Sequence, residues 1–326
     1  MGREWRTTSW LTPDDDEGAM QPQAQSASPT PAQPDPRRRL SLRAGSAQVQ
    51  RRKAANALMT GLIGGSALVS VGVLWFILGY IVKQGAPALN WAFFTQNPAP
   101  LGEVGGGVAP AILGTLTMVG IGGLIGIPVG VGAGIYLSEF GRGRFADGVR
   151  FVADLLTGLP SIAVGAFVWA VLVRRVIGNY NAIAGGVALS IIMIPIITRT
   201  VEEILKLVPN HLREASLALG TPQWRTIVRV VLPVARGGIL TGVVLSLARA
   251  GGETAPLLLT ALGNEFFSFR LREPMAALPL QIYNYAKSPY ADSHTKAWGS
   301  SLVLIAVIGL LSIAVRVAAR RTQLQR

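Results

Sequence analysis

The sequence has no cysteine and only two histidines, so it can build neither a disulfide framework nor a thiolate metal site. Charge is also scarce, since Asp, Glu, Lys and Arg make up 14% of the 326 residues. The sequence contains no H-E-x-x-H or G-x-S-x-G motif and no phosphate-cradling G-x-x-x-x-G-K-[ST] loop, because no lysine follows a glycine. We therefore expect no bound metal, no ATP or other cofactor and no enzymatic activity in this chain.

Apolar residues, by contrast, are abundant. They make up 50% of the chain and fall in blocks of roughly 20 residues, the length that crosses a bilayer as a helix. The pattern predicts an all-α membrane protein with six spanning helices, at about 57–82, 110–138, 152–173, 181–200, 235–262 and 297–317. The ends of the third and fourth blocks are the least sharply marked.

The first 52 residues have a different composition, rich in Pro, Gln, Ser and Ala, with "DDDE" at 14–17 and "RRR" at 37–39. Such a segment buries too little apolar surface to offset the entropy lost on ordering, which predicts a disordered tail over 1–52. The acidic cluster lies where the apolar region of a secretory signal would be. We expect the membrane domain to cover 53–326.

The formal net charge of +13 could indicate nucleic-acid binding or the basic loops of a membrane protein. If both termini lie on one side of the membrane, 20 lysines and arginines from Arg37 onward fall on that side and 7 on the other. This bias predicts cytoplasmic termini and a lipid bilayer, not nucleic acid, as the partner. Arg174 and Arg175 lie on the outer side and run against the rule.

The second span, "GTLTMVGIGGLIGIPVGVGAGIYL" at 114–137, is rich in glycine. Small residues let helices approach closely, so we interpret these glycines as packing positions and place no site there.

The segment "VPNHLREASLALGTPQWRTIVRVVLP" at 208–233 is too polar to span a membrane. We predict two short helices joined by a sharp corner. Asn210 would cap the first helix, Gly220 would take the left-handed position at its end, and Thr221 would cap the second helix with Pro222 as its first residue.

This segment resembles the EAA loop of ABC importer permeases. The resemblance rests on Glu214, Ala215, Ser216 and Gly220, followed by Leu232-Pro233, with Ser216 where the family usually has a second Ala. It implies that the first short helix couples the permease to a cytoplasmic ATPase, which must be another chain. The alternative is an amphipathic helix on the membrane surface without a partner.

Two charges, Arg249 and Glu253, interrupt the apolar stretch "LSLARAGGETAPLLLTAL" at 245–262. A charged side chain at the centre of a spanning helix costs roughly 2.5–3.5 kcal/mol. On an unbroken helix the two residues share a face and could simply neutralise each other. Alternatively, Arg249 offers its planar donors to an oxyanion on a translocation path, with Glu253 holding or gating it.

Since the pair is neutral, attraction of an anion needs another cation, for which Arg199 in "PIITRTVEE" is the candidate. Arg199 could equally be a basic residue that orients the inner end of its helix. The nearby Gly251, Gly252 and Pro256 free backbone groups and predict a hinge in the fifth span.

The stretch "ARAGGETAPLLLTAL" also resembles the PstA-type permeases of phosphate ABC importers. The resemblance extends to 110–140, to "LLTGLPSIAVGAF" at 155–167 and to 198–227, and covers about 55–320. It implies a type I ABC importer permease fold in the bacterial inner membrane and import of inorganic phosphate. It also implies that the substrate passes Arg199, Arg249, Glu253 and Thr254.

The resemblance further implies an assembly with a homologous second permease of the PstC type, two ATPase subunits that bind ATP and Mg, and an extracytoplasmic phosphate-binding protein. The outer loops at 83–109 and 263–296 would face that binding protein, although interfacial aromatic belts also explain their aromatic residues. We expect alternating access, in which the helix around 210–220 moves with the ATPases and opens the Arg249 site to the cytoplasm.

Two rival functions stay open at this point. The chain could be an ABC permease for another oxyanion, such as sulfate, molybdate or phosphonate. It could also be a secondary anion transporter or channel in which Glu253 relays protons, which the coupling loop argues against.

Overall fold

The computed structural model describes residues 36–100 and 102–324, which divide between residues 69 and 70 into two compact units, the second of which is called unit 70–326 below. The described residues form helices and loops without a strand, which confirms the all-α prediction. The α-helices are α1 (Pro36–Gly85), α2 (Trp91–Thr95), α3 (Ala109–Ile135), α4 (Arg144–Gly158), α5 (Ser161–Val168), α6 (Ala182–Lys206), α7 (Asn210–Ala218), α8 (Gln223–Thr226), α9 (Leu232–Gly251), α10 (Ala255–Thr260), α11 (Leu278–Ala286) and α12 (Ala291–Leu324). A 3-10 turn, η1 (Ala86–Ala88), follows α1, and π-helical segments η2 (Tyr136–Phe140), η3 (Trp169–Ile177) and η4 (Ile227–Val231) continue α3, α5 and α8.

Among the described residues, five helical stretches are long and apolar enough to cross a membrane. They cover Gln48–Ala88, Ala109–Phe140, Ala182–Lys206, Gln223–Gly251 and Ala291–Val317. A sixth span exists if the bent pair Arg144–Gly158 and Ser161–Ile177 counts as one. The predicted number of six therefore holds only with that broken span included.

The prediction of a continuous third span at 152–173 is wrong. Helix α4 ends at Gly158 and the chain turns by 105° before α5 starts at Ser161. Pro160 has no N–H to donate and disfavours helical geometry in the residue before it, and Leu159 accordingly takes φ −71° and ψ 138°. The apolar run continues through this break, which is why composition alone suggested one helix.

The predicted fifth span is also interrupted. Helix α9 ends at Gly251, and α10 begins at Ala255 with Pro256 in its first turn. The break coincides with the Gly251-Gly252 pair, although a hinge motion at this point stays a prediction.

Helix α1 begins at Pro36, inside the segment predicted to be a disordered tail. Proline suits the first position of a helix, and the Arg, Leu, Ala and Gln residues that follow are good helix formers. The rest of the predicted tail, 1–35, lies outside the described residues.

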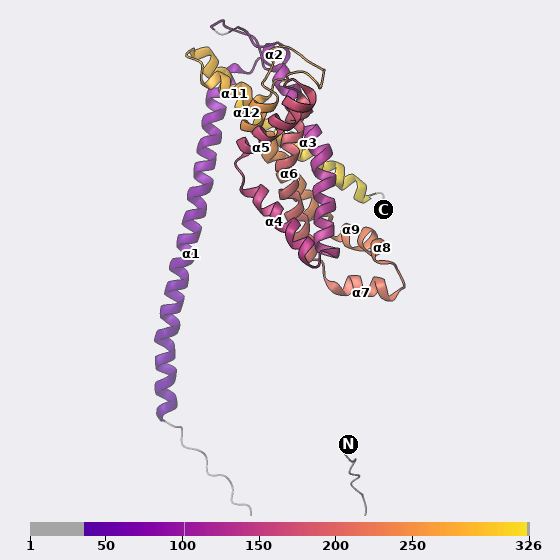
Figure 1. Cartoon of the computed structure of the whole chain (residues 1–326). Coiled ribbons are helices and arrows are strands. Elements are labelled where there is room, and N and C mark those ends of the chain that lie inside the picture. The colour runs from indigo at the N-terminus through magenta and orange to yellow at the C-terminus, as the bar shows by residue number, and fades with distance from the viewer. Residues whose placement is uncertain (1–35, 101, 325–326) are drawn as a thin grey trace, which may run out of the picture. The chain divides into compact units, whose positions relative to one another are not determined.

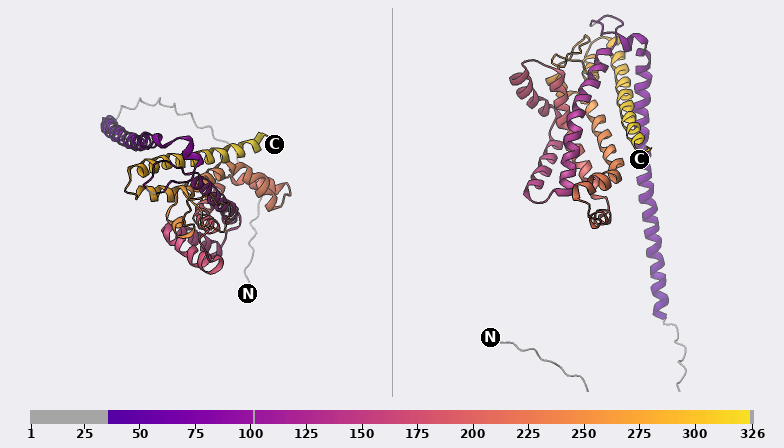
Figure 2. Two further views of the ribbon diagram at one scale, coloured as in Figure 1. Left: turned by 90° about the horizontal axis from the view of Figure 1, so that it is seen from above. Right: turned by 90° about the vertical axis from the view of Figure 1, so that its right-hand side faces the viewer.

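The core of unit 70–326 is centred on the packing of α3 against α6, which lie side by side in both views (Figures 1 and 2). Glycines at every fourth position of α3 form the contact. Cβ atoms built at Gly122, Gly126, Gly130 and Gly134 would meet, in order, the Cβ atoms of Leu189, Met193, Ile197 and Val201, within 2.6 to 3.2 Å. At Gly130 and Gly134 the distance is under 3.0 Å, so an added Cβ would force a shift, whereas at Gly122 and Gly126 the contact would be tight. This supports the interpretation of the glycines as packing positions.

The short helices lie at the two ends of this unit. Helices α7 and α8 project at one end, and α2, α11 and the loops beside them lie at the other (Figure 1). This arrangement separates the predicted coupling loop from the predicted outer loops.

Candidate functional site

The predicted coupling loop forms two short helices, α7 and α8, as expected, but their starts differ from the prediction. Pro209, with φ −60° and ψ 137°, occupies the capping position that we assigned to Asn210, and Asn210 is the first helical residue. Pro222 likewise occupies the capping position expected for Thr221, so α8 starts at Gln223. The fixed φ of proline suits this non-helical position, and neither α7 nor α8 has a side-chain capping bond. Gly220 has φ +75°, the left-handed geometry predicted for it.

Side-chain contacts fix the loop in place. Arg213 donates to Glu139 Oε1 at 2.7 Å and to the carbonyl oxygens of Leu205 at 2.9 Å and Val208 at 2.6 Å. The hydroxyl groups of Ser216 and Thr226 lie 2.8 Å apart and join α7 to α8. Sequence reasoning missed Arg213 and Glu139, because 74 positions separate them and neither belongs to a local motif.

The exposed surface of the predicted coupling loop is apolar. Helix α7 has no buried residue, and Glu214 and Ala215 are exposed. The side chains of Leu217, Leu219 and Trp224 are 47%, 86% and 59% exposed. The loop therefore presents three large apolar groups that the described part of the chain leaves uncovered.

Arg249 and Glu253 lie on either side of a helix end. Arg249 is in the last turn of α9, whereas Glu253 lies in the break after it, so they do not share an unbroken helix as we assumed. Their side chains still approach, with 3.8 Å from Arg249 Nε to Glu253 Oε1. The Arg249 side chain is 55% exposed and that of Glu253 15%. No other carboxylate in the described part of the chain pairs with Arg249.

A small cavity of about 10 Å³, room for about one water molecule, adjoins Arg249. It lies between the α4–α5 break and α6, with Thr157 and Ser161 as its hydroxyl-bearing residues and Ile192 and Ile196 as its wall on α6. Ile192, Ile196 and Arg199 follow one another at helical spacing along one face of α6. Arg199 is one turn beyond Ile196, a rise of about 4.5 Å. Arg249, on α9, therefore faces the same side of α6 that carries Arg199 one turn further on.

Arg199 does not supply the unpaired cation that we expected. Its Nε donates to Asp154 Oδ1 at 2.8 Å and its Nη2 donates to Asp154 Oδ2, while its Nη1 donates to Glu202 Oε2 at 3.0 Å. Two carboxylates therefore occupy the guanidinium. This arrangement corrects the sequence picture of Arg199 as a free positive charge, because its partner Asp154 is on α4, 45 positions away.

Glu202 is the centre of the wider charge network. It is 1% exposed and accepts hydrogen bonds from Arg150 Nε and Lys206 Nζ, both at 2.7 Å, as well as from Arg199. Arg150 also donates to Asp147 at 3.0 Å and to the Leu137 carbonyl at 3.0 Å. The spacing of Arg199, Glu202 and Lys206 could have indicated local pairs from sequence, but Arg150 and Asp154 could not be placed without the fold.

The remaining predicted residues surround the break in the fifth span. Thr254 precedes α10, where its carbonyl accepts from Leu258 N at 3.0 Å and its side chain makes no capping bond. Gly251 is buried against Ile308 of α12, and a Cβ at Gly165 would lie 2.6 Å from Pro256 Cα. The break is therefore held between α5 and α12.

Known proteins similar to this chain fall in one class. The family model described as binding-protein-dependent transport system inner membrane component matches residues 126–323. The phosphate transport system permease protein PstA of Haemophilus influenzae is 46% identical over 79% of this chain and 92% of its own length. PstA 1 of Mycobacterium tuberculosis (strain H37Rv) is 36% identical over 84% of this chain and 92% of its own length.

Solved structures support the same fold. An inward-facing structure of the MetNI methionine ABC transporter matches with a TM-score of 0.52 at 21% identity, covering 66% of this chain and 94% of that one. A bacterial ABC transporter for import of the polysaccharide alginate matches with a TM-score of 0.50 at 15% identity, covering 65% and 78%. The fold is that of type I ABC importer permeases. The chain therefore belongs to the binding-protein-dependent transport system inner membrane components, with PstA-type phosphate permeases as its relatives, and it is a multi-pass membrane component and not an enzyme.

Proposed function

We propose that this chain is the transmembrane subunit of an ATP-driven importer that carries inorganic phosphate into the cytoplasm. The main support for this proposal is the similarity of this chain to PstA of Haemophilus influenzae, at 46% identity over 79% of this chain and 92% of PstA. Within the structure, support comes from a half-exposed arginine, Arg249, whose one carboxylate partner, Glu253, lies 3.8 Å away.

Arg249 is the first binding group of the proposed path. Phosphate must lose hydration water when it enters a low-dielectric passage, and unpaired oxygens there are costly. A guanidinium replaces that water with a planar set of donors. The 3.8 Å contact to Glu253 is too long for a strong hydrogen bond, so an arriving anion can compete for Arg249.

Arg199 with Asp154 forms the next step along the same face of α6. The Asp154 carboxylate binds the guanidinium through two oxygens, as a phosphate would. Asp154 is 59% exposed, so its side chain has room to leave. In this mechanism phosphate displaces Asp154 from Arg199 on its way to the cytoplasm.

The partners follow from the surfaces that this chain leaves open. The apolar face of Leu217, Leu219 and Trp224 fits a groove of a cytoplasmic ATPase, two copies of which bind the ATP and Mg, so this chain needs no cofactor. The half-exposed Arg249 fits an interface with a homologous permease of the PstC type that encloses the path from the other side. An extracytoplasmic binding protein delivers the phosphate.

We further propose that both termini lie in the cytoplasm. Helices α7 and α8 then lie at the inner face, and α2 and α11 at the outer face (Figure 1). The excess of basic residues on the side of the termini supports this orientation.

ATP-dependent uptake of labelled phosphate into vesicles with the reconstituted importer tests the function. Arg249→Gln, alone and combined with Glu253→Gln, should lower uptake at least about tenfold, because the anion loses a charged donor worth ~1.5–3 kcal/mol. ATP hydrolysis stimulated by the binding protein should persist. Arg270→Gln, in an outer loop, is the matched control.

Two results would contradict the proposal. Normal uptake by the assembled double variant would make Arg249 and Glu253 a structural ion pair. Uptake of labelled sulfate in preference to phosphate by the wild-type importer would replace the substrate.

A further inference from the structure

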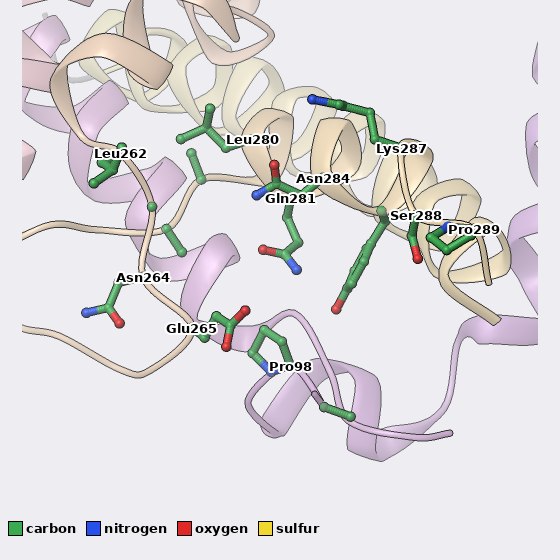
Figure 3. Close-up of a pocket in the computed structure, with 15 residues that line it drawn as sticks. Pro98, Leu262, Asn264, Glu265, Leu280, Gln281, Asn284, Lys287, Ser288 and Pro289 are labelled. Carbon is green, nitrogen blue, oxygen red and sulfur yellow. The ribbon is translucent and has the colours of Figure 1, made fainter. Parts of the chain in front are cut away.

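A cavity of about 570 Å³ opens beside α11 (Figure 3), at the end of unit 70–326 opposite α7 and α8 (Figure 1). Three segments far apart in sequence line it: the loop at Pro98 and Ala99, the loop from Leu262 to Glu265, and helix α11 with the residues after it. None of the residues assigned to the phosphate path lines it. The cavity is therefore a separate site on the proposed outer face.

The buried side of this cavity carries an unused hydroxyl group. Tyr285 on α11 is only 5% exposed, and its Oη has no hydrogen-bond partner. The Gln281 amide lies near enough to influence the pKa of this phenol, but the two side chains do not form a hydrogen bond. A buried hydroxyl without a partner is costly, so its presence indicates a group that arrives from outside.

The electrostatics of the cavity decide which group fits. Glu265 lies at the rim and Gln281 points into the space, whereas the Lys287 ammonium is turned away (Figure 3). Lys287 Nζ instead lies 4.7 Å from the Tyr283 ring centroid and 3.3 Å from its hydroxyl. Burial raises the pKa of the Tyr285 phenol, and the charges of Glu265 and Asp292 raise it further, so the phenol stays neutral.

This cavity does not suit the substrate. A phosphate ion would meet the Glu265 carboxylate, while the one lysine of the lining, Lys287, holds its ammonium against Tyr283. An ammonium or guanidinium group, in contrast, could pair with Glu265 and donate to the oxygens of Gln281 and Tyr285. The cavity is wide enough for a side chain of a protein loop.

We infer that this cavity is a docking pocket for a lysine or arginine side chain of the extracytoplasmic binding protein, recognised by Glu265, Gln281 and Tyr285. The inference rests on the proposed function, which places the binding protein at this face. It adds to the general contact of the outer loops one specific pocket, which receives a basic side chain of the binding protein.

Stimulation of ATP hydrolysis by increasing binding protein, measured on the complete reconstituted importer, tests this pocket. Glu265→Gln should raise the half-saturating concentration of binding protein about fivefold or more and weaken its salt dependence, because an interface charge is lost. Tyr285→Phe should raise it about threefold or more, since it removes one hydrogen bond. Both should leave the maximal rate unchanged. Glu273→Gln is the control, because Glu273 is in the same loop but pairs with Arg270 at 2.9 Å.

The absence of cysteine allows a direct second test. Asn284→Cys would place the only thiol of this chain in the cavity, and a thiol-to-amine cross-linker should then capture lysines of the binding protein. Asn179→Cys, which is exposed and outside the cavity, should capture far fewer.

The inference would be overturned if Glu265→Gln and Tyr285→Phe both left the half-saturating concentration of binding protein unchanged. Equal cross-linking from Asn284→Cys and Asn179→Cys would overturn it as well. Wild-type vesicles that take up phosphate normally in the same experiment show that only the pocket assignment has failed. Wild-type vesicles without phosphate uptake would instead refute the proposed function.

Discussion

At the scale of single residues, the charges inside the helical bundle differ in how firmly they are bound. Arg249 has one distant carboxylate, Arg199 has two close ones, and Glu202 is surrounded by three cations. Sequence reasoning found Arg249, Glu253 and Arg199, because a charge within an apolar run is visible without a fold. It could not find Asp154 or Arg150, whose importance depends on α4 lying against α6.

Glu202 should be the most sensitive of these residues for stability. Glu202→Gln leaves Arg150, Arg199 and Lys206 without their shared carboxylate and should lower the free energy of unfolding by about 1–3 kcal/mol. Thermal unfolding of the purified protein in detergent measures the change. The neighbouring Glu203 is exposed, and Glu203→Gln should leave the melting temperature nearly unchanged. Equal effects of both substitutions would mean that the network does not stabilise the fold.

At the scale of elements, local chemistry predicted some breaks and missed others. The α9–α10 interruption has a visible signal in Gly251, Gly252 and Pro256, and the corner at Gly220 was predicted from its residue type. The α4–α5 break was missed although Gly158 and Pro160 mark it, because the apolar run continues through both. The register of α3 against α6 could not be predicted, since the sequence shows glycines but not the partners they meet.

The glycine contact between α3 and α6 allows a test with two adjacent positions. A Cβ at Gly134 would lie 2.6 Å from the Val201 Cβ, whereas a Cβ at Gly132 would meet nothing within 4 Å. Gly134→Ala should therefore destabilise the protein by about 1–3 kcal/mol through overpacking. Gly132→Ala should be neutral or stabilising by up to about 1 kcal/mol, because alanine favours helix. Melting temperatures in detergent in the reverse order would contradict this packing.

At the scale of the whole molecule, unit 70–326 has different surfaces at its two ends. One end presents the apolar residues of α7 and α8, and the other presents a cavity with a carboxylate at its rim. From the sequence, the bias of basic residues and the EAA-like loop predicted that the two ends differ, with the coupling loop at one and the outer loops at the other. It could not reveal the cavity, which brings together Pro98, Glu265 and Tyr285 from three distant segments.

The apolar end should determine binding of the ATPase. Leu219→Ser removes the most exposed large side chain of the loop, and it should lower co-purification of the ATPase subunits and phosphate uptake at least about fivefold, because burial of a leucine contributes ~1.5–3 kcal/mol. Phe269→Ser, at a 78% exposed residue of an outer loop, is the control and should leave ATPase binding intact. Retention of the ATPase by the Leu219 variant would place the contact elsewhere on this chain.

The half-exposed Arg249 also has a consequence for the life of the protein before assembly. If the companion permease proposed above encloses Arg249, a copy without that partner would leave the guanidinium open to lipid, at a cost of roughly 2.5–3.5 kcal/mol. Assembly would remove that cost by enclosing the charge. On this proposal, surplus copies, produced when the subunits are synthesised in unequal numbers, would be less stable in the membrane than assembled ones.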